Sequence, residues 1–258
     1  MTYEFNGRKY EQASSHQTRW GSGVLAELAL RGDERVLDLG CGNGALTERL
    51  ADVVPDGSVL GIDASEGMLE AAYEKKKPNL EFRQMDIENL QVSGPFDLIF
   101  SNAALHWVKD HGTLWRDIES LLSKTGAVRF NFAAQGNCHH FCSIIRRAMD
   151  LPEYRECFRE FVWPWFTPDV QQYREILKPY RFSEVDVWEQ NADTFFPDRQ
   201  AIIGWINQPS IVPFLRHVPE DKKEGFRHYV IDRMLEETRK EDGTYFETFR
   251  RINVRVKK

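Results

Sequence analysis

The sequence has no long apolar run and no apolar N-terminal segment. No stretch approaches the ~20 consecutive apolar residues that a membrane helix needs, and the N-terminal MTYEFNGRKYEQ lacks the apolar core of a signal peptide. Basic residues are outnumbered, because the formal net charge is -6 at pH 7, so no broad positive field exists to gather nucleic acid. We therefore expect a cytoplasmic protein, a monomer or homodimer, that acts on neither membranes nor nucleic acid.

Cysteine is also scarce. The four cysteines, Cys41, Cys138, Cys142 and Cys157, are too few and too irregularly spaced for a disulfide scaffold, and they fit a reducing compartment. The run CHHFC from Cys138 to Cys142 contains metal-ligating residue types, but a structural zinc site needs four converging ligands and no matching pair occurs elsewhere. We expect no metal, and we expect these thiols to lie on a helix.

What is present is the pattern of an α/β protein. The length of 258 residues suits one α/β domain with a sizeable elaboration. Short β-rich runs alternate with amphipathic helical patterns from about residue 34 to 132, which indicates parallel βαβ units. The predicted strands are Val36 to Leu39, Val59 to Asp63, Leu80 to Gln84, Phe96 to Ser101 and Ala127 to Phe132.

The second half departs from that rhythm. Apolar and polar residues alternate strictly around Val185 and Val187 and again from Ile252 to Val256, which predicts an antiparallel pair of strands closing the sheet. The stretches 134–180 and 197–242 have helical spacing and many aromatics. We expect them to form a helical cap over the site.

The segment VLDLGCGNG, residues 36–44, predicts a cofactor-binding loop. Gly40, Gly42 and Gly44 follow a strand and open a helix, where the backbone must come close to a ligand and no Cβ fits. The same glycines also match the G-x-G-x-x-G/A pattern of dinucleotide-binding folds. The glycines alone leave NAD and S-adenosylmethionine as alternatives.

Polar residues after four successive strands distinguish the two cofactors. Asp38, two residues before Gly40, suits the ammonium and sulfonium of S-adenosylmethionine and would repel a pyrophosphate. Asp63 ends the second strand, where an acid accepts ribose hydroxyls, a feature that both cofactors share and that indicates only an adenosine. We place Asp86 and Ile87 at the adenine, and Asn102, after the fourth strand, at the methionine part. The pattern predicts S-adenosylmethionine as cofactor and S-adenosylhomocysteine as product.

The segment from Tyr10 to Trp20 looks like the helix that closes over bound cofactor in small-molecule methyltransferases. We expect Gln12, Gln17 and Trp20 to approach the cofactor. An amphipathic helix that packs Trp20 on the sheet is an equally good interpretation of these residues.

Four segments carry a resemblance to one family over nearly the whole chain: VLDLGCGNG, GIDASEGML, DLIFSNAALHWVKDH and QAIIGWINQPSIVPFL. The chain resembles the trans-aconitate methyltransferases and, more distantly, the juvenile hormone acid methyltransferases. The resemblance implies a Rossmann-like class I fold, with a mostly parallel seven-stranded sheet, helices on both faces and helical cap insertions. Within one domain we expect cofactor-closing helices in 1–33, the core in 34–133, and the remaining strands with the cap in 134–258. Ala64 and Met68, in the second segment, join the predicted cofactor site.

The resemblance implies O-methylation of a small-molecule carboxylate by in-line methyl transfer. A carboxylic acid is already ionised at neutral pH, so the site needs positioning rather than a general base. His106 stands where the trans-aconitate enzymes have Gln, and the pair His106 and Trp107 resembles the hormone-acid branch. We expect His106, Trp107 and Trp205 at the acceptor, with His106 positioning it.

Arginines fit carboxylates bidentately and are the candidates for clamping an organic acid. The candidates are Arg146, Arg147, Arg199 and Arg250, and the further aromatics Trp163 and Trp165 are candidates for the pocket wall. Alternatives remain open at this point: a lipid or terpenoid acid, an amine, a thiol or arsenic acceptor using Cys138, Cys142 and Cys157, or a module that binds S-adenosylmethionine without catalysis.

Overall fold

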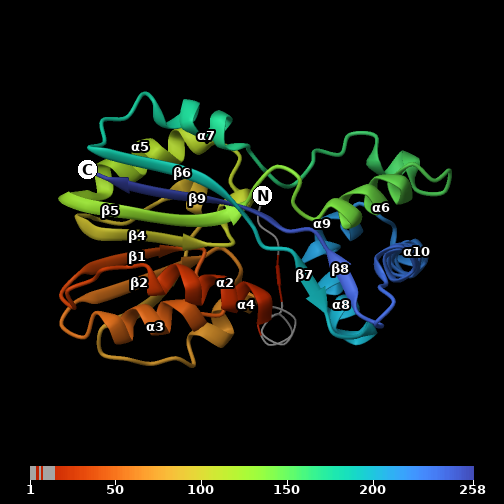
Figure 1. The fold of residues 1–258 in the computed structure, drawn as a ribbon, viewed down its shortest axis with the longest axis horizontal. Helices are drawn as coiled ribbons and strands as arrows, with labels where there is room; N and C mark the ends of the chain where they lie inside the picture. Colours follow the sequence, from red (N-terminus) through yellow and green to blue (C-terminus); the bar gives the residue numbers. More distant parts are fainter. Residues whose placement is uncertain (1–3, 6, 8–14) are drawn as a thin grey trace.

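The structure is a computed structural model, and it describes residues 4–5, 7 and 15–258. A seven-stranded sheet with strand order β3-β2-β1-β4-β5-β9-β6 forms its centre (Figure 1). Neighbouring strands from β3 to β5 are parallel, whereas β9 is antiparallel to both β5 and β6. The bounds are Arg35–Leu39 (β1), Ser58–Asp63 (β2), Leu80–Gln84 (β3), Phe96–Asn102 (β4), Leu122–Ala133 (β5), Glu184–Asn191 (β6) and Arg250–Lys257 (β9). The predicted mostly parallel sheet and its antiparallel closing pair are confirmed.

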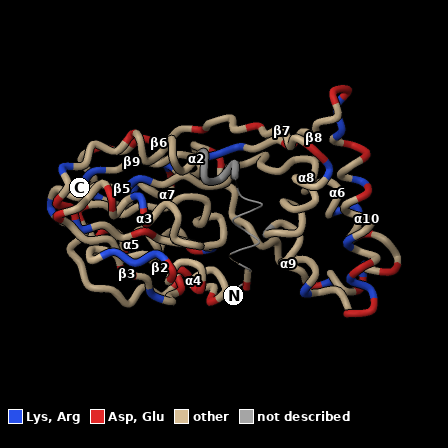
Figure 2. Tube along the Cα trace, turned by 90° about the horizontal axis from the view of Figure 1, so that it is seen from below, with Lys and Arg blue, Asp and Glu red and all other residues tan. Residues whose placement is uncertain are grey.

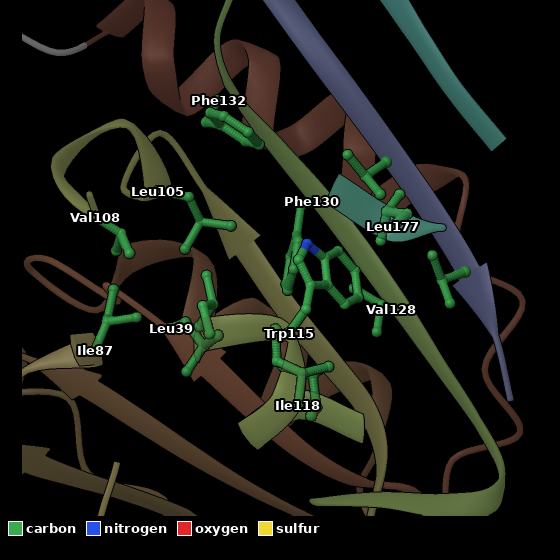
Figure 3. Packing of buried hydrophobic residues seen from close by; sticks show 14 of the residues in the cluster. Leu39, Ile87, Leu105, Val108, Trp115, Ile118, Val128, Phe130, Phe132 and Leu177 are labelled. Atoms are coloured by element: carbon green, nitrogen blue, oxygen red, sulfur yellow. The ribbon is translucent and has the colours of Figure 1, made fainter. Parts of the chain in front are cut away.

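Helices cover both faces of the sheet because the strands are apolar on both sides. Successive residues of β1 face opposite sides of the sheet: Val36 packs in a cluster with α2 and α3, and Leu37 packs in a cluster with α5. Figure 3 shows Trp115 of α5 beside Phe130 of β5, with Ile118 below Trp115. The helices around the sheet are α2 (Ser15–Ala26), α3 (Ala45–Val53), α4 (Glu66–Ala72), α5 (His111–Leu121) and α7 (Val170–Leu177), with short 3-10 turns η1 (Ile87–Asn89) and η2 (Leu105–Trp107).

The remaining elements form a second lobe, which we call the cap (Figure 1, right). It has a buried cluster of its own, centred on Phe141, Trp205 and Phe214. A two-stranded sheet, which the sequence patterns did not predict, lies within the cap. The cap elements are α6 (His139–Met149), η3 (Arg155–Phe158), β7 (Thr194–Phe196), α8 (Arg199–Trp205), η4 (Ile206–Ser210), α9 (Val212–Leu215), α10 (Glu220–Thr238) and β8 (Tyr245–Glu247).

The cap is smaller than the stretch 134–180 plus 197–242 predicted. Helix α7 lies within the first stretch, but Tyr173 and Leu177 of this helix belong to the sheet cluster rather than to the cap cluster. The Tyr173 hydroxyl accepts a hydrogen bond from Trp115 Nε1 at 3.0 Å and lies 2.9 Å from His111 Nδ1, both on α5. This buried polar network holds α7 on the sheet, so the residues of the first stretch that line the cavity end at Thr167, before α7 begins.

The connections on either side of β9 join the two lobes. Ala134 N donates to Arg250 O at 2.9 Å, Cys138 N to Thr248 O at 2.8 Å and Ala192 N to Phe249 O at 2.9 Å. Residues 248–250 thus pair with the segments that follow β5 and β6. The cap is therefore attached at the carboxyl ends of the parallel strands.

Acidic and basic residues are interspersed along α10 on the outside of the cap (Figure 2). Its buried side, which includes Phe226 and Val230, belongs to the cap cluster. Within the described residues, no helix is both long enough and apolar enough to cross a membrane.

Candidate active site

A cavity of about 710 Å³ lies between the carboxyl edge of the sheet and the cap. Open α/β sheets bind ligands at this edge. The wall on the sheet side includes Asp38, Gly40, Gly42, Asp63, Met68 and Asn102. The wall on the cap side includes residues of α6, the loop before α7, and Trp205. Both predicted halves of the site therefore face one space.

The glycine loop is held in a form that excludes side chains. Gly40 has φ +75°, and a Cβ there would lie 2.2 Å from the Cβ of Ala104. Gly42 has φ +56° and lies beside Met68, whose Cε would be 3.2 Å from a Cβ. Gly40 N donates to Ile62 O at 2.8 Å, which ties the loop to β2. Glycine is required here by the backbone conformation and by close approach.

Asp38 supplies a buried acid beneath this loop. Only 2% of Asp38 is exposed, and one carboxylate oxygen accepts a hydrogen bond from Thr47 Oγ1 at 2.7 Å. Burial, together with a smaller contribution from the nearby Asp63, raises the pKa of Asp38 to about 7 against the opposing effect of the Thr47 hydrogen bond. A cation in the cavity would favour the ionised form of this acid.

Asp63 lies at the end of β2 on the same wall. Its Oδ2 accepts from Gly42 N at 2.8 Å and its Oδ1 from Ser65 N at 2.9 Å, so the loop and the start of α4 fix the carboxylate. Burial raises the pKa of Asp63, and these backbone hydrogen bonds lower it. Carboxylate oxygens each have a second acceptor site, which leaves Asp63 able to receive hydroxyl donors.

Asn102 ends β4 and lines the same cavity. Within the described part of the chain, its Oδ1 is buried and has no hydrogen-bond partner. A buried acceptor of this kind usually has a partner, which a bound ligand can provide. Asn102 is thus suited to the amino or hydroxyl groups of a cofactor.

Three of the other predicted cofactor residues do not line the cavity. Asp86 caps η1 by accepting from Glu88 N at 3.0 Å, Ile87 is buried close to Gly40, and Ala64 O accepts from Gln84 Nε2 at 3.2 Å. Their predicted contacts with the adenine side of the cofactor stay predictions.

The predicted closing segment is described only in part. Gln12 lies outside the described residues, and Gln17 lies on α2 but its side chain is outside the described ones. Trp20 lines the cavity, with its ring centroid 5.0 Å from that of Phe249. Trp20 therefore contacts a residue next to β9 rather than packing only on the sheet.

Four tryptophans predicted from the sequence line the cavity: Trp107, Trp163, Trp165 and Trp205. Trp107 and Trp165 lie edge to face with ring centroids 5.8 Å apart, and Trp163 and Trp165 do so at 5.6 Å. Phe166 N donates to His106 O at 2.8 Å, which fixes this loop beside η2. Trp205, 1% exposed, packs on Phe141 and Phe249. The predicted tryptophans thus line the cavity, and their rings pack on one another and on Phe141 and Phe249.

His106 lines the cavity between the two walls. Burial lowers the pKa of His106 to about 3, with contributions from the charges of Arg251 and Lys109. Its Nδ1 is buried without a hydrogen-bond partner among the described residues. His106 is therefore a neutral, weakly basic imidazole that can position a ligand but is a poor general base.

Among the residues that the structure describes, three arginines line the cavity, and two others that the sequence suggested do not. The Arg146 guanidinium lies 4.3 Å from the ring centroid of Trp163, whereas Arg147 lines the cavity but also pairs with Glu237 at 2.6 Å. Arg250 pairs with Asp193 away from the cavity wall, and Arg199 is exposed at the start of α8. Of the four sequence candidates, Arg146 best fits an acceptor clamp.

Sequence reasoning missed Arg251. This side chain is 3% exposed, lines the cavity, and donates through Nε to Asn131 Oδ1 at 2.9 Å. Its guanidinium carbon lies 5.0 Å from the Trp20 ring centroid. The signal was available, because the first residues of a strand antiparallel to β5 lie at the carboxyl edge of the parallel strands.

The cysteines are poorly suited to thiolate chemistry. Cys138 and Cys142 both line the cavity, and burial raises the pKa of the Cys138 thiol and brings that of Cys142 to about 12. A thiol, rather than a thiolate, is the form expected at neutral pH, and the thiolate is the metal- and arsenic-binding form. In residues 4–5, 7 and 15–258, no group of three His, Cys, Asp or Glu side chains could hold a metal ion.

S-adenosylmethionine fits the residues of the sheet wall. Its ammonium and sulfonium suit the Asp38 side of the wall, its ribose hydroxyls suit Asp63, and the orphaned Asn102 oxygen offers a further acceptor. The strand order and the glycine loop are those of the class I methyltransferases that depend on this cofactor.

Comparisons with known proteins agree. Residues 30–164, more than half of the chain, match a methyltransferase domain family. The trans-aconitate 2-methyltransferase of Escherichia coli K12 is 30% identical over 248 residues, covering 91% of this chain and 89% of the relative. That of Azoarcus sp. BH72 is 27% identical over 233 residues, covering 86% of each. The chain belongs to this family of S-adenosylmethionine-dependent methyltransferases.

Solved structures show the same fold at low sequence identity. A phosphoethanolamine N-methyltransferase of Haemonchus contortus, in complex with S-adenosylhomocysteine, aligns with a TM-score of 0.61 at 17% identity, over 97% of this chain and 56% of that one. The YcgJ protein of Bacillus subtilis aligns with a TM-score of 0.60 at 17% identity, over 94% and 97%. The predicted fold class, enzyme class and cofactor are confirmed.

Proposed function

We propose that this enzyme transfers a methyl group to a carboxylate oxygen of a small organic acid, with trans-aconitate as the first candidate. The observation that carries the proposal is the pair of guanidinium groups, Arg146 of α6 and Arg251 of β9, which line the same cavity as the cofactor residues. Guanidinium groups bind carboxylates with two parallel hydrogen bonds. The family relatives named trans-aconitate 2-methyltransferase support the same acceptor.

The titratable groups of the cavity also favour an acceptor that needs no deprotonation. His106 is a weak base because burial lowers its pKa to about 3, and Cys138 and Cys142 are thiols. An amine or phenol must lose a proton during methylation, whereas a carboxylic acid of pKa near ~4 is already ionised at neutral pH. Among the described residues that line the cavity on the α6 side, the acid is Asp150, which is exposed and directly follows α6.

The residues then act by binding and orientation. S-adenosylmethionine supplies an electrophilic methyl group on its sulfonium. Asp38, Asp63 and Asn102 would hold the cofactor, and Arg146 and Arg251 would turn one carboxylate oxygen toward that methyl group. The tryptophan wall excludes water, which strengthens these charge interactions. Positioning of this kind contributes up to ~7–11 kcal/mol in favourable cases.

A panel of acceptors tests the proposal. Purified protein and S-adenosylmethionine are incubated with trans-aconitate, other di- and tricarboxylates, fatty and terpenoid acids, amines, phenols, thiols and arsenite, and products are analysed by mass spectrometry. We expect a methyl ester that mild base hydrolyses, from an organic acid only. Methylation confined to amines, phenols, thiols or arsenite would contradict the proposal.

The cysteines provide an independent test. Replacing Cys138, Cys142 and Cys157 together with Ser would leave a carboxyl methyltransferase active. The same substitutions would abolish methylation of an arsenic acceptor, since thiolates are its ligands.

A further inference from the structure

The first turn of α6 is capped by a carboxylate from a distant part of the chain. Glu247, on β8, is fully buried and accepts hydrogen bonds from His140 N at 3.1 Å and Phe141 N at 2.9 Å. The residue that precedes the helix, Cys138, has φ +53° and provides no side-chain cap. Glu247 thus satisfies two N–H groups that a helix leaves unpaired at its start.

Two more hydrogen bonds fix the Glu247 carboxylate. His140 Nδ1 lies 3.1 Å from Oε1, and because a carboxylate only accepts, this nitrogen carries the hydrogen. Thr248 N donates to the same oxygen at 2.7 Å. All four groups facing the carboxylate are donors, so the helix N-terminus and Glu247 form one rigid unit whose charge complements the helix dipole.

Helix α6 forms part of the cap-side wall of the cavity. His139, Cys142, Ser143, Arg146 and Arg147 all line it. Arg146 lies six residues beyond His140, which is about 9 Å along the helix axis. A tilt of about 10° at the first turn would therefore move Arg146 by about 1.5 Å, and a displacement of about 1 Å can cost about 100-fold in rate.

We propose that Glu247 is a positioning residue for the methyl acceptor: its carboxylate fixes the angle of α6 and thereby the place of Arg146 in the cavity. Glu247 itself does not line the cavity, so it acts through the helix. This inference rests on the proposed function, because it assigns the α6 wall to the acceptor.

The substitution Glu247→Gln tests the proposal with little change in size. The amide nitrogen cannot accept an N–H, so at least one of the four hydrogen bonds is lost. We expect KM for trans-aconitate to rise about tenfold, with Kd for S-adenosylhomocysteine, measured by calorimetry, changed less than about twofold. Hydrogen exchange of the His140 and Phe141 amides should accelerate.

Asp169→Asn is the matched control. Asp169 caps α7 by accepting from Gln172 N at 2.7 Å, and it is also an acid at the N-terminus of a helix. Because α7 packs on the sheet, this substitution should lower Tm without changing KM for the acceptor. An equal effect of both substitutions on KM would overturn the positioning role, since general destabilisation would explain it.

The pH profile gives a readout that a purely structural role would not change. The hydrogen bond to Glu247 raises the pKa of His140, against burial, and Lys240 and Glu237 also act on this imidazole. Protonated His140 strengthens the unit, so KM for the acceptor should increase as pH rises through the raised pKa. In His140→Gln this increase should be absent, while the bonds from Glu247 to the helix remain.

The outcomes separate the two proposals. If no carboxylate is methylated by the unmodified enzyme, the proposed function fails, and KM is then measured with the acceptor that the panel identifies. If a carboxylate is methylated but Glu247→Gln leaves KM unchanged, the positioning role fails alone. A proportional loss of acceptor and S-adenosylhomocysteine binding would also overturn it, because the effect would not be confined to the α6 wall. Should Glu247→Gln fail to fold, His140→Gln still decides through its pH profile.

Discussion

The two walls of the cavity are built in different ways. On the sheet wall, Asp38, Asp63 and Asn102 lie in or at the ends of parallel strands, and backbone N–H groups hold Asp63 in place. On the cap wall, side chains come from α6, a loop and α8, and aromatic rings of the loop pack on one another and on Phe214. The cap also contains irregular backbone, such as Gln208 within η4, with φ -150° and ψ 105°.

This difference explains why one cofactor can serve many acceptors. Strand ends in a parallel sheet have fixed relative positions, so the chemistry of the sheet wall is set by the fold. Insertions after β5 and β6 can change in sequence without disturbing the strands. If this comparison holds, substitutions on the sheet wall should affect the cofactor, and substitutions on the cap wall should affect the acceptor alone.

The largest effect is expected from Asp38→Asn. The loss of one buried charge facing the cofactor's cation should raise Kd for S-adenosylmethionine about 100-fold, which corresponds to about 2.7 kcal/mol. Calorimetry measures this directly. Asp97→Asn is the control, since Asp97 lies at the opposite end of β4 and accepts from Arg35 N at 3.0 Å. An unchanged Kd in Asp38→Asn would remove Asp38 from the cofactor site.

One histidine of each lobe should respond to pH in the direction opposite to the other. His111, in the sheet lobe, is 2% exposed, and burial lowers its pKa to about 4. In the unfolded chain His111 has a pKa near 6.5, so it binds a proton more readily there than in the folded protein. His111 therefore lowers the free energy of unfolding as pH falls from 6.5 toward 4. The cost reaches about 2 kcal/mol at pH 5. His140, in the cap, has a raised pKa, so its contribution is lost as pH rises.

Urea unfolding at pH 5.0 and 7.5 measures the His111 effect. From pH 5.0 to pH 7.5, the free energy of unfolding should rise by about 2 kcal/mol more in the unmodified protein than in His111→Gln. Comparison with this variant is needed because Asp38, whose pKa is raised to about 7, acts with the opposite sign over this range. Equal pH dependence in both proteins would show that His111 is protonated in the folded state.

A smaller effect, confined to the acceptor, is expected from Arg146→Ala. Loss of one charge-assisted contact should raise KM for the acceptor about tenfold, and Kd for S-adenosylmethionine should stay the same. Arg147→Ala is the matched control, because Arg147 is next to Arg146 on α6 but its guanidinium pairs with Glu237. If both substitutions raise KM equally, the general positive charge of α6, rather than a specific clamp, attracts the acceptor.

The sequence predicted the sheet wall better than the cap wall, and particular residues show why. Asp38, Asp63 and Asn102 could be placed together because consecutive parallel strands end at one edge. Asp86 has the same position after β3, yet its carboxylate caps η1 and does not reach the cavity wall. Whether such a side chain lines the cavity or caps a turn depends on the local path of the chain after the strand, which residue spacing does not predict.

Arginine positions show a second limit of the sequence, on β9 of the sheet and on α6 of the cap. Arg250 and Arg251 are neighbours on β9, and since successive side chains of a strand face opposite ways, a one-residue difference decides which enters the cavity. Arg146 and Arg147 likewise differ by 100° around α6. The sequence named three of these four but could not rank them, because the rank depends on how the cap is docked.

The smallest expected effect tests the protonation state of Asp38. With a pKa of about 7, this acid is about half ionised at pH 7 in the absence of a ligand, and a bound cation favours the carboxylate. Binding of S-adenosylmethionine at pH 7 should therefore release about half a proton, and affinity should increase as pH rises through 7. Calorimetry in buffers of different ionisation enthalpy measures the release, and at pH 8.5 it should approach zero. If no proton is released at pH 7 while Asp38→Asn still weakens binding, Asp38 is already ionised, and the Thr47 hydrogen bond outweighs burial in setting its charge.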